Sequence, residues 1–222
     1  MTAGAVAEHG FYLRALRTPL SYYDGLPADY SAANVAYPLQ YEPEASLLYF
    51  APEFVDQVSL VETVLRGLPA GHLLWVKEHP NQFGALGEPR WRALKRRYAN
   101  LRFVYGRESG RTLMRRSGLV VTISSSAGMD ALLLGRRVMV AGTIFYRHFT
   151  GALPIGSPAE IARLLNDPAN YGPVDNRDAN VREMTEFTAR CYLGDPQPAH
   201  DLFKAENLDR IVAAIRAECG AA

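Results

Sequence analysis

The chain alternates short apolar runs with segments in which apolar residues recur every three or four positions. The runs are rich in β-branched residues, as expected for strands buried on both faces of a parallel sheet. They predict strands at Leu47–Phe50, Leu73–Lys77, Leu101–Tyr105, Leu119–Ile123 and Arg137–Gly142. The segments with helical spacing predict a helix just after Ser126 and helices at Phe54–Leu68, Pro89–Tyr98, Ser109–Arg116, Pro158–Asn166, Asn180–Tyr192 and Leu202–Cys219. This alternation predicts right-handed βαβ units and an α/β fold with a doubly wound parallel sheet.

The chain of 222 residues has room for one substantial core but hardly for two full α/β domains. Residues 1–36 are rich in Tyr and Ala and lack periodicity, so we expect a linker or docking arm there. Residues 37–222 then form one α/β domain with C-terminal helices, the last two separated by Asp195-Pro-Gln-Pro198.

The composition is that of a soluble globular protein, with 48% hydrophobic and 21% charged residues. With 24 basic and 23 acidic residues, the overall charge does not indicate binding to nucleic acid. Basic residues do cluster between Arg90 and Arg97, as the solvated face of one helix or as a face that meets an anionic membrane surface. No apolar run approaches the roughly 20 residues of a membrane span, and the N-terminus has no secretory signal. We therefore expect a cytoplasmic protein, with membrane contact at most peripheral at the inner face.

The two cysteines, Cys191 and Cys219, lie far apart and lack metal-ligand spacing. They predict neither a disulfide framework nor a zinc site, and no other His, Cys or Asp spacing suggests a metal.

Three consecutive serines, Ser124, Ser125 and Ser126, follow the most apolar strand and precede a helix. Unpaired backbone N–H groups and the positive end of the helix dipole make such a place attractive to an anion, and the hydroxyls add further donors. Alternatively, one serine is the N-cap and the others pack in a tight turn. This segment alone does not decide between the two interpretations.

Three predicted strands end in polar residues that should share one edge of the sheet, because ligands of such folds bind beyond the carboxyl ends of the strands. One strand leads to Glu78 and His79, one to the serines, and one to Tyr146 and Arg147. An imidazole, hydroxyls and a guanidinium together suit a phosphate with a sugar or base attached. Neither a G-x-G-x-x-G nor a P-loop motif is present, so neither a dinucleotide nor a P-loop nucleotide is indicated.

Several of these segments resemble one known family. Four segments look like parts of bacterial capsule and surface polysaccharide biosynthesis proteins. They are Lys77-Glu-His-Pro80, Ser124-Ser-Ser-Ala-Gly128, Gly142-x-x-Phe-Tyr146 and Pro38-Leu-Gln-Tyr-Glu-Pro-Glu-Ala-Ser46. That group includes the β-Kdo transferases and is distantly similar to bacterial sialyltransferases. The resemblance covers about residues 37 to 150. It implies the Rossmann-like C-terminal half of a GT-B glycosyltransferase, which holds a nucleotide-sugar donor.

The resemblance also implies roles for individual residues. In the sialyltransferase-like relatives a His-Pro pair and a Ser-Ser/Thr pair contact the CMP moiety; here these fall on His79, Pro80 and Ser124–Ser126. Gln40 and Glu44 match the Q-x-x-x-D segment of retaining β-Kdo transferases, which implies a catalytic carboxylate, although glutamate replaces aspartate. The alternative for Glu44 is an ordinary loop position before the first core helix.

Other candidates also have two interpretations. Glu78 would accept a hydrogen bond from a ribose hydroxyl or pair with Lys77 or Arg147, and Tyr146 would contact the nucleotide or belong to the core. For His79 the alternative to ligand binding is a histidine that ties down its loop.

A complete GT-B enzyme needs a second Rossmann-like domain, for which this chain lacks room. The chain is therefore expected to be a fragment or a free-standing donor domain that works with a partner domain or subunit, and activity of the chain alone stays open. The expected ligands are a CMP-linked acid sugar such as CMP-Kdo and a glycan or glycolipid acceptor, with no other cofactor and no metal. The alternatives are a non-catalytic nucleotide- or partner-binding module of the same fold and a UDP-sugar enzyme such as a GT-B epimerase.

Overall fold

A computed structural model of the chain describes residues 18–192 and 203–220. Residues 1–17 of the predicted N-terminal arm and the Asp195–Pro198 break therefore lie outside the described residues. The chain divides into two compact units, residues 1–180 and 181–222, and each is described by itself.

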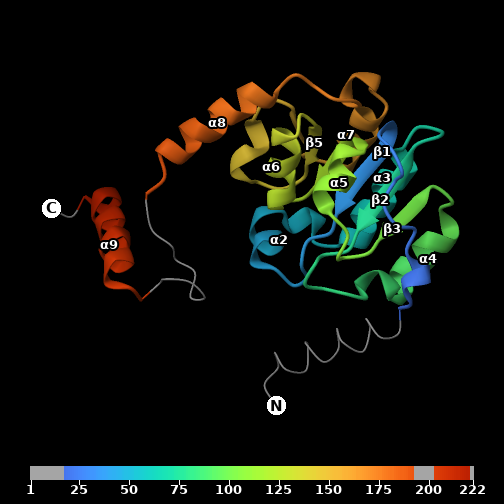
Figure 1. Cartoon of the computed structure of the whole chain (residues 1–222), viewed down its shortest axis with the longest axis horizontal. Coiled ribbons are helices and arrows are strands. Elements are labelled where there is room, and N and C mark those ends of the chain that lie inside the picture. The colour runs from blue at the N-terminus through green and yellow to red at the C-terminus, as the bar shows by residue number, and fades with distance from the viewer. Residues whose placement is uncertain (1–17, 193–202, 221–222) are drawn as a thin grey trace, which may run out of the picture. The chain divides into compact units, whose positions relative to one another are not determined.

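The first unit is built on a six-stranded sheet in the order β3-β2-β1-β4-β5-β6, with every neighbouring pair parallel (Figure 1). The strands are β1 (Ser31–Pro38), β2 (Leu73–Lys77), β3 (Leu101–Val104), β4 (Ser117–Thr122), β5 (Arg137–Val140) and β6 (Ala152–Pro154). This order and direction are those of the doubly wound Rossmann-like fold. The predicted fold class is confirmed.

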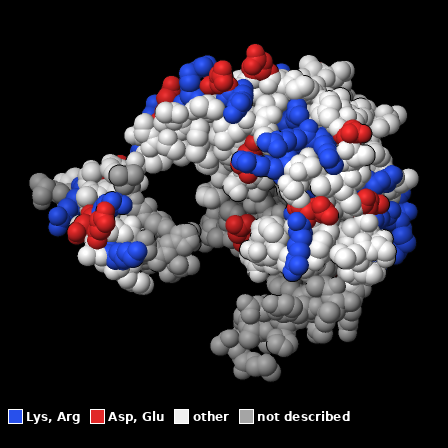
Figure 2. Space-filling model, viewed as in Figure 1, with Lys and Arg blue, Asp and Glu red and all other residues white. Residues whose placement is uncertain are grey.

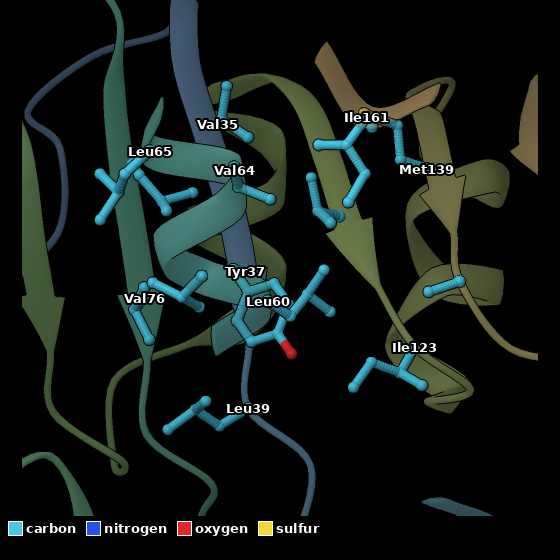
Figure 3. Packing of buried hydrophobic residues seen from close by; sticks show 14 of the residues in the cluster. Val35, Tyr37, Leu39, Leu60, Val64, Leu65, Val76, Ile123, Met139 and Ile161 are labelled. Atoms are coloured by element: carbon cyan, nitrogen blue, oxygen red, sulfur yellow. The ribbon is translucent and has the colours of Figure 1, made fainter. Parts of the chain in front are cut away.

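Helices cover both faces of the sheet. The helices of the first unit are α2 (Ala45–Phe50), α3 (Gln57–Gly67), α4 (Pro89–Arg97), α5 (Gly110–Arg115), α6 (Ser126–Leu133) and α7 (Pro158–Leu165). Side chains of α3, α4 and α7 share one core cluster with Val35 and Tyr37 of β1. Figure 3 shows Leu60 and Val64 of α3 packed over these strand residues. Ala36, between them, is equally buried and faces the opposite layer, since successive strand side chains alternate.

Local signals in the sequence explain where these helices begin and end. Asp56 caps α3 by accepting the N–H of Ser59, and the helix stops shortly before Pro69, which cannot continue it. Ser157 and Glu160 form a capping box at the start of α7. The ends of these two helices lie within three residues of the positions predicted from periodicity.

Two predictions near the N-terminus are wrong. The run Leu47–Phe50, predicted as a strand, lies in helix α2, where Leu47 is buried while Leu48 and Tyr49 are exposed. A four-residue apolar run has no period that separates strand from helix, and the preceding proline and Glu44 allow a helix to start here.

The predicted boundary after residue 36 falls inside β1, a central strand that we had assigned to the arm. Its Ser-Ala-Ala-Asn-Val-Ala-Tyr-Pro sequence has few strand-favouring residues. Its polar residue is satisfied: Asn34 donates to the carbonyl of Arg116 at 3.0 Å and accepts the indole N–H of Trp75 at 2.9 Å. The small side chains permit close packing, because a Cβ at Gly118 of β4 would overlap the backbone of Ala32.

The predicted basic cluster lies on α4 and is largely ion-paired. Arg90 pairs with Asp56 at 2.6 Å, Arg97 with Glu62 at 2.7 Å, and Lys95 with Asp24 at 2.7 Å. Figure 2 shows basic side chains beside acidic ones on the visible face. The cluster therefore has the character of a solvated helix face.

The second unit contains most of α8 (Arg177–Ala189) and all of α9 (Ala205–Cys219). Within it, the hydroxyl of Tyr192 donates to the carboxylate of Glu218 at 2.8 Å. Across residues 18–192 and 203–220, none of the helices has the length and apolar character needed to cross a lipid bilayer.

Candidate functional site

The candidate site lies where the winding of the sheet reverses, between the carboxyl ends of β1 and β4. The chain leaves β1 for β2 on one side and later returns to place β4 on the other side of β1. The two strands therefore diverge into helices on opposite faces, which leaves a crevice at their carboxyl ends, the usual ligand position in doubly wound sheets.

A cavity of about 320 Å³ occupies this crevice. Its volume is at the lower end of the roughly 300–1,000 Å³ typical of small-molecule sites. It is lined by residues that follow four different strands: Gln40, Tyr41, Glu44, His79, Ser124, Ser125, Ser126, Ile144, Phe145 and Tyr146. The structure thus brings seven sequence-predicted site residues together and adds Tyr41, Ile144 and Phe145.

Gln40 joins the ends of β1 and β4. Its side-chain Nε2 donates to Ser124 Oγ at 3.0 Å, and the Ser124 backbone N–H donates to Gln40 Oε1 at 2.9 Å. The backbone of Gln40 is itself fixed by Gln57, which accepts its N–H at 2.9 Å and donates to its carbonyl at 3.0 Å. The side chains of Gln40 and Gln57 are both almost fully buried. Gln40 therefore holds the rim of the cavity in place.

The three serines have three different environments. Ser124 is bonded to Gln40, whereas Ser125 is the N-cap of α6, its Oγ accepting the N–H of Ala127 at 3.2 Å. Ser126 is exposed and begins the helix. The N-cap interpretation thus holds for Ser125. The turn also presents the amino end of α6 to the cavity, so it combines a hydroxyl with the positive end of a helix dipole.

His79 follows β2 and is half-buried at the cavity wall. Its Nδ1 accepts the backbone N–H of Asn81 at 3.2 Å, which assigns the proton of the neutral ring to Nε2. The ring meets Tyr41 edge-on, with 5.7 Å between centroids. Burial lowers the pKa of His79; the carboxylate of Glu44 opposes this shift, and the ammonium of Lys77 adds to it. A neutral imidazole with one N–H donor is therefore expected at pH 7.

Glu44 lies on the same cavity as His79, at the N-terminus of α2. Its side chain is exposed, and its negative charge acts on the imidazole. Gln40, Glu44 and His79 line the same cavity, so a carboxylate lies beside the imidazole and the serine turn.

Tyr146 forms the floor beneath the serine turn. Its hydroxyl donates to the carbonyl of Ser125, its ring is fully buried, and burial raises its pKa well above the ordinary value. A Cβ at Gly128 would overlap the Tyr146 ring, so only glycine fits there. Tyr146 is thus a core residue and a lining residue at once.

Three predicted site residues lie outside the lining of the cavity. Pro80 is exposed beside His79. Arg147 donates to the backbone carbonyls of Gly142 at 3.0 Å and Ile155 at 3.3 Å, which fixes the loop after β5. Glu78 is completely buried, and its carboxylate accepts bonds from Tyr23 and from the backbone of Leu86. Sequence reasoning placed these residues on the correct rim but could not give the direction of their side chains.

Among the described residues that line the cavity there is no lysine or arginine, and Glu44 is the one carboxylate. An anion bound here would be held by neutral donors, namely hydroxyls, the imidazole and backbone N–H groups. Phe145, which is 39% exposed, and Tyr41 supply aromatic surface beside these donors.

A family model described as "Capsule polysaccharide biosynthesis protein" matches residues 28–152 of the chain. The matched segment runs from just before β1 to the start of β6 and includes every residue that lines the cavity. No curated protein matches the chain.

Several solved structures resemble the chain at low identity. The β-Kdo 2,7 transferase KpsC of Thermosulfurimonas dismutans is 17% identical with a TM-score of 0.45, over 84% of this chain and 63% of that one. The UDP-GlcNAc 2-epimerase of Methanocaldococcus jannaschii is 12% identical with a TM-score of 0.45, over 80% and 50%. The wall teichoic acid polymerase TagF is 12% identical with a TM-score of 0.38, over 96% and 48%. The chain thus spans about half to two thirds of the length of these proteins.

Proposed function

The chain belongs to the capsule polysaccharide biosynthesis protein family, and we propose that its cavity binds the nucleotide part of an activated sugar donor for a glycosyltransferase. The observation that carries this proposal is the meeting of His79 and the serine turn on one cavity at the switch point of the sheet. In the proposed complex the phosphate lies against the N-terminus of α6 and Ser126, where backbone N–H groups are available. The Nε2–H of His79 donates to the phosphate or the ribose.

The charge of the cavity favours a donor with a single phosphate link, such as a CMP-linked acid sugar, over a nucleoside diphosphate sugar. A diphosphate carries a second negative charge, which is usually met by arginine, lysine or a metal ion. The described lining residues include no basic side chain except the neutral His79, and Glu44 adds a negative charge. Neutral donors at a helix N-terminus suffice for one phosphodiester. We therefore propose CMP as the nucleotide.

In this proposal Glu44 is the catalytic carboxylate and Gln40 positions the serine turn. Transfer breaks the bond between the anomeric carbon and the phosphate oxygen, so CMP leaves with the bonding electrons, and the acceptor hydroxyl supplies the new oxygen and loses its proton. Glu44 is exposed on the same cavity as the proposed phosphate site, which suits a nucleophile or base near the anomeric carbon. Gln40 has both ends of its amide bonded to Ser124. Transfer to a glycan or glycolipid acceptor requires a second domain or subunit.

The direct test is a titration of the protein with CMP, CDP, UMP and UDP by calorimetry, together with a thermal-shift series. At 100 times Kd, a ligand that binds only the folded protein stabilises it by about 2.7 kcal/mol. We expect CMP to bind more tightly than UDP. No binding of CMP together with clear binding of UDP would contradict the CMP assignment and favour a UDP-sugar enzyme.

Substitution of His79 tests the location of the site. A hydrogen bond to a charged group contributes about 1.5–3 kcal/mol, so His79→Ala should weaken CMP binding by about one to two decades. His148→Ala is the matched control, because His148 is exposed and does not line the cavity. Equal CMP affinity in the two variants would place the nucleotide elsewhere.

Glu44 is tested by separating binding from transfer. Because it is assigned to the chemical step, Glu44→Gln should keep CMP affinity within about twofold while transfer, assayed with the acceptor domain or partner present, falls by at least about two decades. Glu53→Gln, an exposed carboxylate outside the cavity, is the control. Full transfer by Glu44→Gln would remove this residue from the chemistry. Binding without transfer by the wild-type protein would favour a non-catalytic module.

A further inference from the structure

A buried carboxylate anchors the loop that carries His79. Glu78 is 0% exposed, and its Oε1 accepts the backbone N–H of Leu86 at 3.3 Å. Burial raises the pKa of Glu78, and hydrogen bonds from Leu86, Tyr23, Gly84 and Gly106 oppose that rise. The hydrogen bond between the Glu78 side chain and the Leu86 backbone thus joins the two ends of a loop, and this restricts the movement of His79 within it.

A side-chain hydroxyl from a distant part of the chain is also bonded to this carboxylate. Tyr23 Oη donates to the two Glu78 carboxylate oxygens at 3.1 and 3.2 Å. Its ring packs on Tyr105, with 5.2 Å between centroids. Within the described part of the chain, backbone N–H groups provide the other hydrogen bonds to the Glu78 carboxylate. A change of the Tyr23 hydroxyl is therefore a selective way to disturb this anchor.

Tyr23 is itself held firmly against the edge of the sheet by its neighbour Asp24. The Asp24 N–H donates to the carbonyl of Phe103 at 2.7 Å, and the Phe103 N–H donates to the Asp24 carboxylate at 2.7 Å. Lys95 of α4 pairs with the same carboxylate at 2.7 Å. The segment before β1 is thus fixed on β3 and α4, and it presents Tyr23 to Glu78 in a defined position.

We propose that Tyr23 is a positioning residue for the nucleotide site, acting through the Glu78 carboxylate on the orientation of His79. The inference rests on the proposed function for what His79 binds, but the link from Tyr23 to His79 is independent of the ligand. Loss of the hydroxyl leaves a buried carboxylate with an unmet acceptor, a costly arrangement that the loop can relieve by letting water reach Glu78. His79, the next residue, then becomes more solvated and less fixed. The segment before β1, which carries Tyr23, therefore affects ligand binding without contacting the ligand.

The chain offers a closely matched control. Tyr22 precedes Tyr23, and its hydroxyl donates to the carbonyl of Leu86 at 3.2 Å, the same loop residue whose N–H binds Glu78. Tyr22→Phe and Tyr23→Phe therefore remove the same group from the same segment and the same loop. Only Tyr23→Phe takes a donor from Glu78.

The test compares these two variants in the full chain by two readouts. The first is the pKa of His79, followed by NMR of its ring protons during a pH titration without ligand. The groups that act on this imidazole are Glu44, Lys77 and the edge of Tyr41. Because burial is the main cause of the lowered pKa, Tyr23→Phe should raise the pKa toward the ordinary 6.5, whereas Tyr22→Phe should leave it unchanged.

The second readout is CMP affinity. Tyr23→Phe should weaken CMP binding by about three- to tenfold and Tyr22→Phe by less than about twofold. In the His79→Ala background Tyr23→Phe should have almost no further effect on CMP affinity, because Tyr23 acts on the ligand only through the imidazole that this variant lacks. An unchanged His79 pKa in Tyr23→Phe, or equal weakening with and without His79, would overturn the inference. If the wild-type protein did not bind CMP, the proposed nucleotide would be wrong while the His79 pKa would still decide the role of Tyr23.

Discussion

At the scale of single residues, the pKa of His79 can be measured directly, and it should change when CMP binds. Burial is the largest cause of its lowered pKa, so in the free protein it should titrate below the ordinary 6.5. A phosphate beside Nε2 favours the imidazolium, so CMP should raise this pKa. At a pH between the pKa of His79 in the free protein and its pKa in the CMP complex, the protein takes up protons when CMP binds. Calorimetry near pH 6 in buffers of different ionisation enthalpy should therefore show more proton uptake by the wild-type protein than by His79→Ala, since protons exchanged by the CMP phosphate are common to both, and equal uptake would separate His79 from the phosphate.

The same scale shows why sequence reasoning reached some site residues and not others. His79 and the serines follow strands directly, so knowledge of strand ends is enough to place them on one rim. Glu78 occupies an equally suggestive position, yet its carboxylate turns inward because Tyr23, 55 positions away, provides a buried donor. Phe145 is apolar, yet it is 39% exposed and lines the cavity. The direction of a side chain depends on partners distant in sequence, which local patterns do not reveal.

At the scale of elements, the contact between α6 and the loop after β5 decides whether the serine turn keeps its geometry. Gly128→Ala should destabilise the protein by about 1–3 kcal/mol, because the added Cβ overlaps the ring and hydroxyl of Tyr146. Gly110→Ala in α5 is the control, since its Cβ would meet only the Lys77 side chain, at 3.8 Å. There the gain in helix propensity should stabilise by up to about 1 kcal/mol. Urea denaturation measures both, and equal stability of the two variants would contradict the packing described for α6.

Strand β1 is an element that the sequence pattern does not predict. A central strand is usually recognised by β-branched and aromatic residues, but β1 has mostly small ones. Gly118 of β4 approaches the backbone of Ala32 too closely for any side chain at position 118, so β1 and β4 pack closely here. The position of β1 is thus set by pairing with β2 and β4, which are far away in sequence. The strongly apolar strands and the capped helices, whose signals are local, are the elements that the sequence predicts correctly.

At the scale of the whole molecule, the sheet unit has its own complete core. The buried hydrophobic residues of the described chain run from Val35 to Leu165, all within the first unit. Near the end of this unit two asparagine side chains bond to it: Asn176 donates to the carbonyl of Thr150 at 3.1 Å, and Asn180 to that of Leu132 at 3.0 Å. The latter carbonyl belongs to α6, whose other end faces the cavity. The sheet unit and its site should therefore depend on the chain up to Asn180 and little on what comes after.

A pair of truncations tests this dependence. A chain that ends at residue 192 keeps both asparagines and should unfold cooperatively within about 3 °C of the full chain, since it loses less than about 1 kcal/mol. Its CMP affinity should stay within about twofold. A chain that ends at residue 174 loses Asn176 and Asn180 and with them their hydrogen bonds to the carbonyls of Thr150 and Leu132, each contributing about 0.5–1.5 kcal/mol. It should melt clearly lower and bind CMP more weakly, because α6 is loosened. If both truncations lost the cooperative transition, the sheet unit would not be self-sufficient, and residues beyond 192 would have to contribute to its stability.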